Sequence, residues 1–226
     1  MLDSVSSTAG CIDDVYTVSS KNSKKRILNA ALSLISKRGG ANVTMAEIAT
    51  AAGVSRQAVY LHFADRGELF VALVRYVDEK RGLAQEIQKI ADSPNGVAAL
   101  TEVAALQART NPGVWAIARA LDAVRRTDEA VEQSWQDRLE DRLKGCREVV
   151  SRLQKEGTLR PGLDPTAAAD LLWTITSLRT WEDLVLQRGW SAKQYEQHVS
   201  ELLLASLTAR TTRGQVHRGG RTSQTR

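Results

Sequence analysis

The chain has 226 residues, of which 42% are hydrophobic and 25% charged, a balance typical of a globular protein. It has only two cysteines, Cys11 and Cys146, and no apolar run near the roughly 20 residues that span a bilayer, so a disulfide framework, a zinc centre and a membrane anchor are not expected. The net charge of +5 is uneven, with −3 over residues 1–20, +6 over 21–63, −3 over 64–208 and +5 over 209–226. A basic block followed by a mildly acidic body favours a localised site for a polyanion. Since the N-terminus lacks a secretory signal pattern, we expect a soluble protein of the reducing cytoplasm.

The first elements are expected to be helices. Residues 1–21 are rich in Ser and Thr without a sustained period, which predicts a disordered arm. An amphipathic pattern then begins at Lys24 and ends at Gly39-Gly40. Thr44-x-x-Glu47 is a capping box that opens a short helix, which ends before Gly53.

Ser55 is the next expected N-cap, for a helix that ends near His62-Phe63. Asp65-x-x-Glu68 begins a long helix that is expected to run through Val77 towards Ile90.

The rest of the chain also has helical periodicity. Breaks at Pro94, Pro112 and Gly157 divide it into helices expected at about 96–109, 112–125, 128–156, 165–188 and 191–209. We therefore expect an all-α fold. Its parts are a three-helix domain over 22–68, a helical body over 69–209 that a long helix joins to it, and a disordered basic tail over 210–226.

Two short helices joined by Ala52-Gly53-Val54 have the pattern of a helix-turn-helix, in which a glycine allows the tight corner. The second helix enters the major groove of DNA in such motifs. Arg can bind guanine with two hydrogen bonds, Gln can do the same with adenine, and Ala or Leu can contact a thymine methyl. The candidate base readers are therefore Arg56, Gln57, Ala58 and Leu61, whereas Val59 and Phe63 are expected to face the core.

The stretch Thr44-x-x-Glu47-Ile48-Ala49-x-x-Ala52-Gly53-Val54-Ser55, continued by Val59-Tyr60-x-His62-Phe63-x-Asp65-Arg66-x-Glu68-Leu69, resembles the N-terminal domain of the tetracycline-repressor (TetR) family. The resemblance covers about residues 24–74 and implies a DNA-binding regulator, with the DNA-binding domain over 22–68 and a helical regulatory and dimerisation domain over 69–209. It also implies phosphate contacts for Thr44, Tyr60, His62 and Arg66. Gly67 stands where the family often has an acid, so this helix start is expected to be looser.

The full set of expected DNA-binding residues is Lys25, Thr44, Ser55, Arg56, Gln57, Ala58, Tyr60, Leu61, His62 and Arg66. Two alternatives remain open from the sequence. Tyr60 and His62 can be packing residues, and the basic run Lys24 to Arg26 can be a solvated helix start.

For the C-terminal body the resemblance implies a homodimer, a palindromic operator and a small-molecule effector whose identity the sequence does not specify. The expected dimer residues are Leu171, Ile175, Leu178, Leu203 and Leu207, and the expected ligand residues are Trp115, Arg119, Asp122, Trp135 and Trp173. For each tryptophan, a role in the core or interface is a competing interpretation.

An enzyme finds little support, because the three histidines are scattered and no hydrolase, zinc-protease or phosphate-loop motif occurs. No metal or cofactor is expected. The remaining alternative is a helical ligand-binding or adaptor protein of the same fold without operator binding.

Overall fold

The computed structural model describes the backbone of residues 9–38 and 43–209, and the side chains from residue 21 onward within those ranges. The described part is all-helical, and its only β contact is a single bridge between Leu159 and Thr208. Its elements are α1 (Ala9–Lys37), α2 (Met45–Ala52), α3 (Arg56–His62), α4 (Arg66–Lys80), α5 (Leu83–Ala91), α6 (Gly96–Arg125), α7 (Glu129–Lys155), α8 (Pro165–Ile175), α9 (Leu178–Trp181), a π-helical turn η1 (Glu182–Gln187) and α10 (Ala192–Leu207). The all-α prediction is confirmed.

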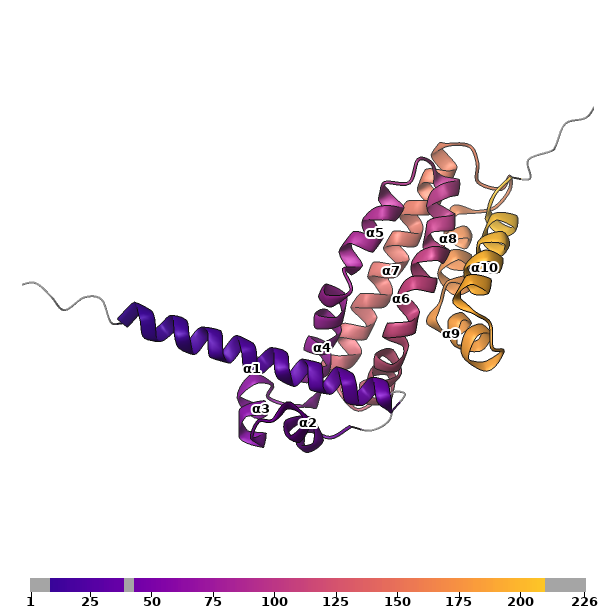
Figure 1. Ribbon diagram of the computed structural model, residues 1–226. Coiled ribbons are helices and arrows are strands. Elements are labelled where there is room, and N and C mark those ends of the chain that lie inside the picture. Colours follow the sequence, from indigo (N-terminus) through magenta and orange to yellow (C-terminus); the bar gives the residue numbers. More distant parts are fainter. Residues whose placement is uncertain (1–8, 39–42, 210–226) are drawn as a thin grey trace, which may run out of the picture.

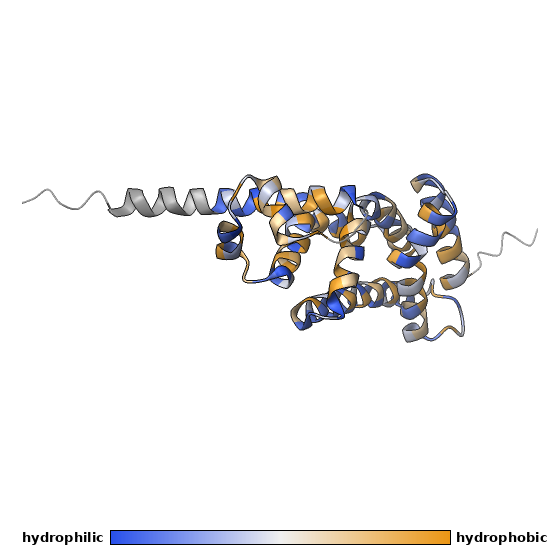
Figure 2. Ribbon diagram, turned by 90° about the horizontal axis from the view of Figure 1, so that it is seen from below, coloured by the Kyte–Doolittle hydropathy of each residue, from blue (hydrophilic) through white to orange (hydrophobic). Residues whose placement is uncertain are grey.

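Helices α1 to α3 lie together at one end of the molecule, and the long helices α6 and α7 run from there towards α8 and α10 (Figure 1). Apolar and polar residues share most helices (Figure 2), as expected for amphipathic helices that bury one face. The apolar faces build two cores. The first core contains residues of the four helices α1, α2, α3 and α4 and of the adjoining ends of α6 and α7. The second contains residues of the far halves of α6 and α7 and of α8, α9 and α10.

The N-terminal arm differs from the prediction. Residues 9–21, expected to be disordered, are the first turns of α1, whereas residues 1–8 and the predicted tail over 210–226 lie outside the described residues. The segment from 9 to 21 contains no proline, and extending an existing helix costs far less than nucleating a new one.

Helix α6 continues where the sequence predicts a break at Pro112. A proline inside a helix loses one backbone hydrogen bond and costs about 3 kcal/mol or more. Packing on both sides offsets this cost, because Ala104 and Ala108 are buried in one core and Ile117 and Leu121 in the other. The prediction was wrong because it used the local signal alone.

Two other expected long helices are interrupted. The helix expected to run from Asp65 towards Ile90 ends at Lys80, and α5 begins after Gly82, whose φ of 63° is left-handed. The helix expected over 165–188 stops at Ile175, and Ser177 caps α9 by accepting a hydrogen bond from Thr180 N. The expected domain boundary between 68 and 69 falls inside α4.

Candidate nucleic-acid interface and interior cavity

The start of α2 is fixed by the predicted capping box. Thr44 Oγ1 accepts a 3.2 Å hydrogen bond from Glu47 N, and Glu47 Oε2 accepts one of 2.8 Å from Thr44 N. Arg38, directly after the end of α1, donates a 2.7 Å bond to Glu47 Oε1. This bond, with those from Thr44, lowers the pKa of Glu47 to about 2. The carboxylate therefore ties α1 to the start of the helix-turn-helix.

Arg26 positions the turn between α2 and α3. Its Nη2 donates to the carbonyls of Ala52 at 2.7 Å and Gly53 at 3.1 Å, which are at the end of α2. Gly53 has a φ of 63°, and a Cβ there would lie 3.0 Å from Arg26 Nη2. Both the backbone conformation and the bound guanidinium therefore favour glycine. The role of Arg26 could not be found from the basic run in the sequence.

Helix α3 presents the expected face to solvent. Ser55 caps it, and Val59 and Phe63 are buried in the first core, which confirms their predicted orientation. Arg56 and Gln57 are exposed, and Leu61 is 80% exposed. Three of the four candidate base readers thus face outward, and Ala58 is half-buried.

Tyr60 and His62 lie in different surroundings. Tyr60 is 53% exposed, whereas His62 is half-buried and shares a 2.5 Å hydrogen bond between its Nε2 and Ser23 Oγ of α1. Lys24 of α1 lies 5.3 Å above the ring of Phe63. His62 therefore helps to join α3 to α1, while Tyr60 and Lys25 stand exposed.

The start of α4 is closely packed. Arg66 lies over the ring of Phe70 with 5.1 Å from Cζ to the centroid. Gly67 is buried, and a Cβ at this position would lie 2.1 Å from Oδ2 of Asp128, the N-cap of α7. The expectation of a looser helix start is thus wrong, since glycine allows α4 to approach the start of α7 closely.

A small interior cavity of about 30 Å³ lies between α4, α6 and α7. Across it, Arg138 of α7 donates two hydrogen bonds of 2.6 and 2.9 Å to the carboxylate of Asp78 on α4. The volume suits about one water molecule. The lining residues are Val74, Val77, Asp78, Val114, Ile117, Ala118, Leu121, Trp135 and Arg138.

Of the five expected ligand residues, only Trp135 lines this cavity. Arg119 pairs with Glu182 at 3.0 Å and lies over the ring of Trp115. Asp122 accepts a 2.7 Å bond from Arg125.

Trp173, the fifth, lies under the guanidinium of Arg142, at 4.9 Å from Cζ to the ring centroid. Arg138 and Arg142, both on α7, were missed because the sequence shows only that α7 is rich in charged residues.

The expected dimer residues divide into two groups. Leu203 and Leu207 are fully buried in the second core of their own chain, so their assignment to an interface is corrected. The period of α10 could not tell which of its leucines face the chain's own core. Leu171 is 38% exposed, and Ile175 and Leu178 are half-buried. Two further exposed apolar residues are Leu202 of α10, at 50%, and Leu186 of η1, at 45%.

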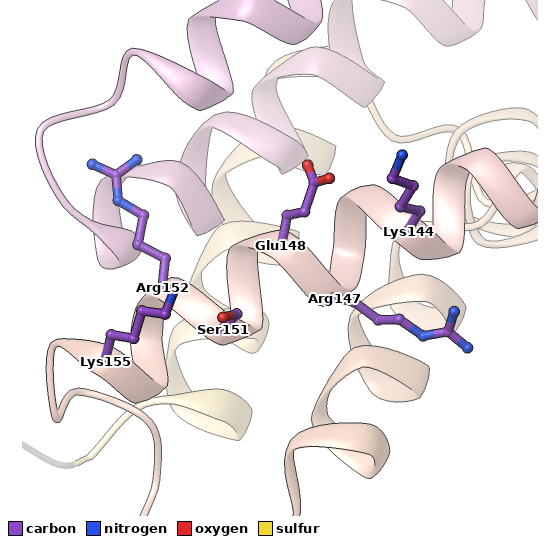
Figure 3. Close-up of a pocket in the computed structure, with 6 residues that line it drawn as sticks. All are labelled: Lys144, Arg147, Glu148, Ser151, Arg152 and Lys155. Carbon is purple, nitrogen blue, oxygen red and sulfur yellow. The ribbon is translucent and has the colours of Figure 1, made fainter.

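A shallow hollow of about 560 Å³ lies on the outer side of α7 (Figure 3). All six side chains that line it come from successive turns of this one helix, and none is buried. The lining is Lys144, Arg147, Glu148, Ser151, Arg152 and Lys155. None of the predicted site residues lies there.

None of the helices that the structure describes has both the length and the apolar character needed to span a membrane.

These features define a helix-turn-helix DNA-binding protein in which α3 is the exposed recognition helix. Residues 27–73 match the model of the bacterial regulatory proteins of the tetR family. Residues 27–73 therefore form a DNA-binding domain of the tetR type, and the chain is a DNA-binding transcriptional regulator.

Two relatives match this chain in sequence over different lengths, and a solved structure shares its fold. The nucleoid occlusion factor SlmA of Marinomonas sp. is 28% identical over 162 residues, which is 69% of this chain and 80% of the relative. The regulator AcrR of Shigella flexneri is 44% identical over 50 residues, which is 22% of this chain and 23% of the relative. A protein of Saccharomonospora viridis, solved in complex with choline, shares the fold with a TM-score of 0.72 and 20% identity over 84% of this chain and all of that one.

Proposed function

We propose that the protein is a homodimeric, ligand-responsive repressor of the cytoplasm that binds a palindromic operator through α3. The observation that carries the proposal is the exposed face of α3, with Arg56, Gln57 and Leu61 outward and Val59 and Phe63 anchoring the helix below. Arginine and glutamine have the donors and acceptors that distinguish base pairs in the major groove. A dimer on an operator blocks access of the polymerase.

The phosphate contacts are assigned to groups around α3. Lys25 and Tyr60 are exposed beside it, and Thr44 and Ser55 are at the N-termini of α2 and α3, where backbone amides attract anions. The guanidinium of Arg66 is at the start of α4, and its Nε is a buried donor without a partner in the described chain. We assign His62 to the same set, acting from its position against α1.

The dimer is proposed to form through α8, η1 and α10. Leu171, Leu186 and Leu202 are the large apolar residues that these elements expose. Burial of apolar surface is the main driving force of such an association. A two-fold dimer would place two copies of α3 about one turn of DNA apart, or somewhat more.

The effector is proposed to act on α4. The small cavity lies directly behind α4, and Asp78 of α4 is held by Arg138 of α7. A space of about 30 Å³ is far below the roughly 300–1,000 Å³ of a ligand pocket. An effector that enters must therefore displace one of the three helices around the cavity, and we assign the movement to α4, which leads directly into the helix-turn-helix.

The test compares Arg56→Ala with Lys25→Ala on a duplex selected from a random library and on a scrambled duplex. Arg56→Ala should lose about 1–3 kcal/mol of discrimination between the two duplexes. Lys25→Ala should weaken binding to both about equally and reduce the slope of log affinity against log salt by about 1. If selective binding survives the loss of both Arg56 and Gln57, the assignment of the base readers is wrong.

A further inference from the structure

Arg142 is a half-buried cation of the helical body that has no counter-charge among the described residues. It is half-buried on α7 and donates from Nη2 to the carbonyl of Trp173 and, at 3.2 Å, to Thr176 Oγ1. It forms no ion pair with the residues that the structure describes, whereas Arg138, one turn earlier, is paired with Asp78. Burial lowers the pKa of Arg142, but a guanidinium in a protein keeps its proton at neutral pH.

The groups near Arg142 add donors and no negative charge. Burial raises the pKa of Tyr195 to about 12 and that of Cys146 to about 11, so both are neutral at pH 7. The Tyr195 hydroxyl is fully buried and, in the described part of the chain, has no hydrogen-bond partner. The ring of Trp181, 1% exposed, meets that of Tyr195 at 4.9 Å, and its Nε1 likewise lacks a partner.

A buried polar group without a partner costs about 1–3 kcal/mol, and an unpaired charge costs more. Tryptophan Nε1 and the guanidinium can only donate, while the tyrosine hydroxyl can donate as well as accept. The group that satisfies all three together is an anion that accepts several hydrogen bonds. A cationic ligand would instead be repelled by the guanidinium at close range.

The surroundings of this cluster are apolar. Trp173 covers one side of Arg142, and Trp181 and Tyr195 belong to the second core with Leu172 and Leu178 packed around them. Arg138 lines the small cavity, and Arg142 follows four residues later on the same face of α7, about 6 Å further along the axis. An acid bound at Arg142 would therefore have apolar neighbours on the side of Trp173 and of the second core.

We propose that the effector is a small amphipathic acid whose carboxylate pairs with Arg142 and accepts hydrogen bonds from Tyr195 Oη and Trp181 Nε1. The inference rests on the proposed ligand-responsive function, which it refines by naming the class of ligand. The apolar part of the acid lies along Trp173 towards the cavity behind α4.

The test titrates the full-length protein with benzoate, octanoate and decanoate, using 1-octanol and octyltrimethylammonium as neutral and cationic controls. Binding is followed by tryptophan fluorescence and by the rise in Tm. The acids should bind more tightly than either control. Arg142→Met should weaken acid binding by more than about tenfold and Tyr195→Phe by about three- to tenfold. Arg147→Met changes an exposed arginine of the same helix and should leave acid binding unchanged.

Tyr195→Phe also distinguishes the loss of a ligand contact from a loss of folding. Because its hydroxyl has no partner in the described chain, the variant without ligand should melt at the same temperature as wild type or higher. The proposal is overturned if no acid binds more tightly than the controls, or if the acids bind Arg142→Met and Tyr195→Phe as tightly as wild type.

Binding to the selected operator separates this inference from the proposed function. If the protein binds the operator but no acid, the inference is overturned and the proposed operator binding is unaffected. Acid binding that depends on Arg142 but leaves operator affinity unchanged supports the acid site and overturns the ligand-responsive function.

Discussion

Gly67 lies where the start of α4 meets Asp128 at the start of α7, with no room for a Cβ between them. Gly67→Ala should displace the Asp128 side chain and its cap hydrogen bond to Val131 N, and lower the free energy of unfolding by about 1–2 kcal/mol. Chemical denaturation measures this change. Gly145→Ala is the control, because that glycine has open space around its Cα and alanine should stabilise α7 by up to about 1 kcal/mol. Equal effects of both substitutions would contradict the account of Gly67.

Glu47 gives the stability of the DNA-binding domain a defined dependence on pH. Its pKa falls from 4.5 to about 2 on folding, so its contribution is fully present above pH 4.5 and is lost as the pH falls towards 2. Glu47→Gln should therefore be less stable than wild type at pH 7. The difference should shrink between about pH 5 and pH 2, as followed by denaturation at each pH. A difference that stays constant over this range would argue against the role of the Arg38 bond.

At the scale of the element, α6 keeps a proline in its interior because both of its halves are packed into cores. Pro112→Ala restores the hydrogen bond to the carbonyl four residues earlier, and should raise the free energy of unfolding by up to about 3 kcal/mol. Thermal or chemical denaturation gives the sign. A loss of stability would mean that the ring of Pro112 makes packing contacts that matter more than the missing bond.

The difference between short-range signals and packing of distant segments explains how much of the fold could be predicted from the sequence. Helix starts depend on residues close in sequence, so the caps at Thr44, Ser55 and Asp65 were predictable. The helical period likewise predicted the core positions Val59 and Phe63. Continuity through Pro112 depends on packing between distant segments, and no local signal reports it.

The candidate site follows the same rule. The face of α3 was predictable because its period is local, whereas the pairing of Arg138 with Asp78 joins residues 60 positions apart. Among the described residues Arg142 has no acidic partner, and this too is a property of the assembled body.

At the scale of the whole molecule, α6 and α7 belong to both cores, so a change near α8 can reach α4 through them. The proposed dimer adds a second copy of α3. Leu171→Glu or Leu202→Glu should convert the dimer to a monomer, because a charge at the centre of an apolar contact is costly to bury. Light scattering at a fixed protein concentration measures this. Ile87→Glu changes an equally exposed apolar residue on α5 and should leave the dimer intact; monomers of wild type would refute the proposal.

The most direct test of the central claim, that α3 reads DNA as one half of a dimer, is selection of bound duplexes from a random library with the full-length protein. We expect an enriched two-fold symmetric sequence whose half-sites lie about 10–10.5 base pairs apart, or somewhat more. With Arg56→Ala the enrichment should weaken at the same position in both half-sites. An enriched sequence without two-fold symmetry, or no enrichment at all, would contradict it.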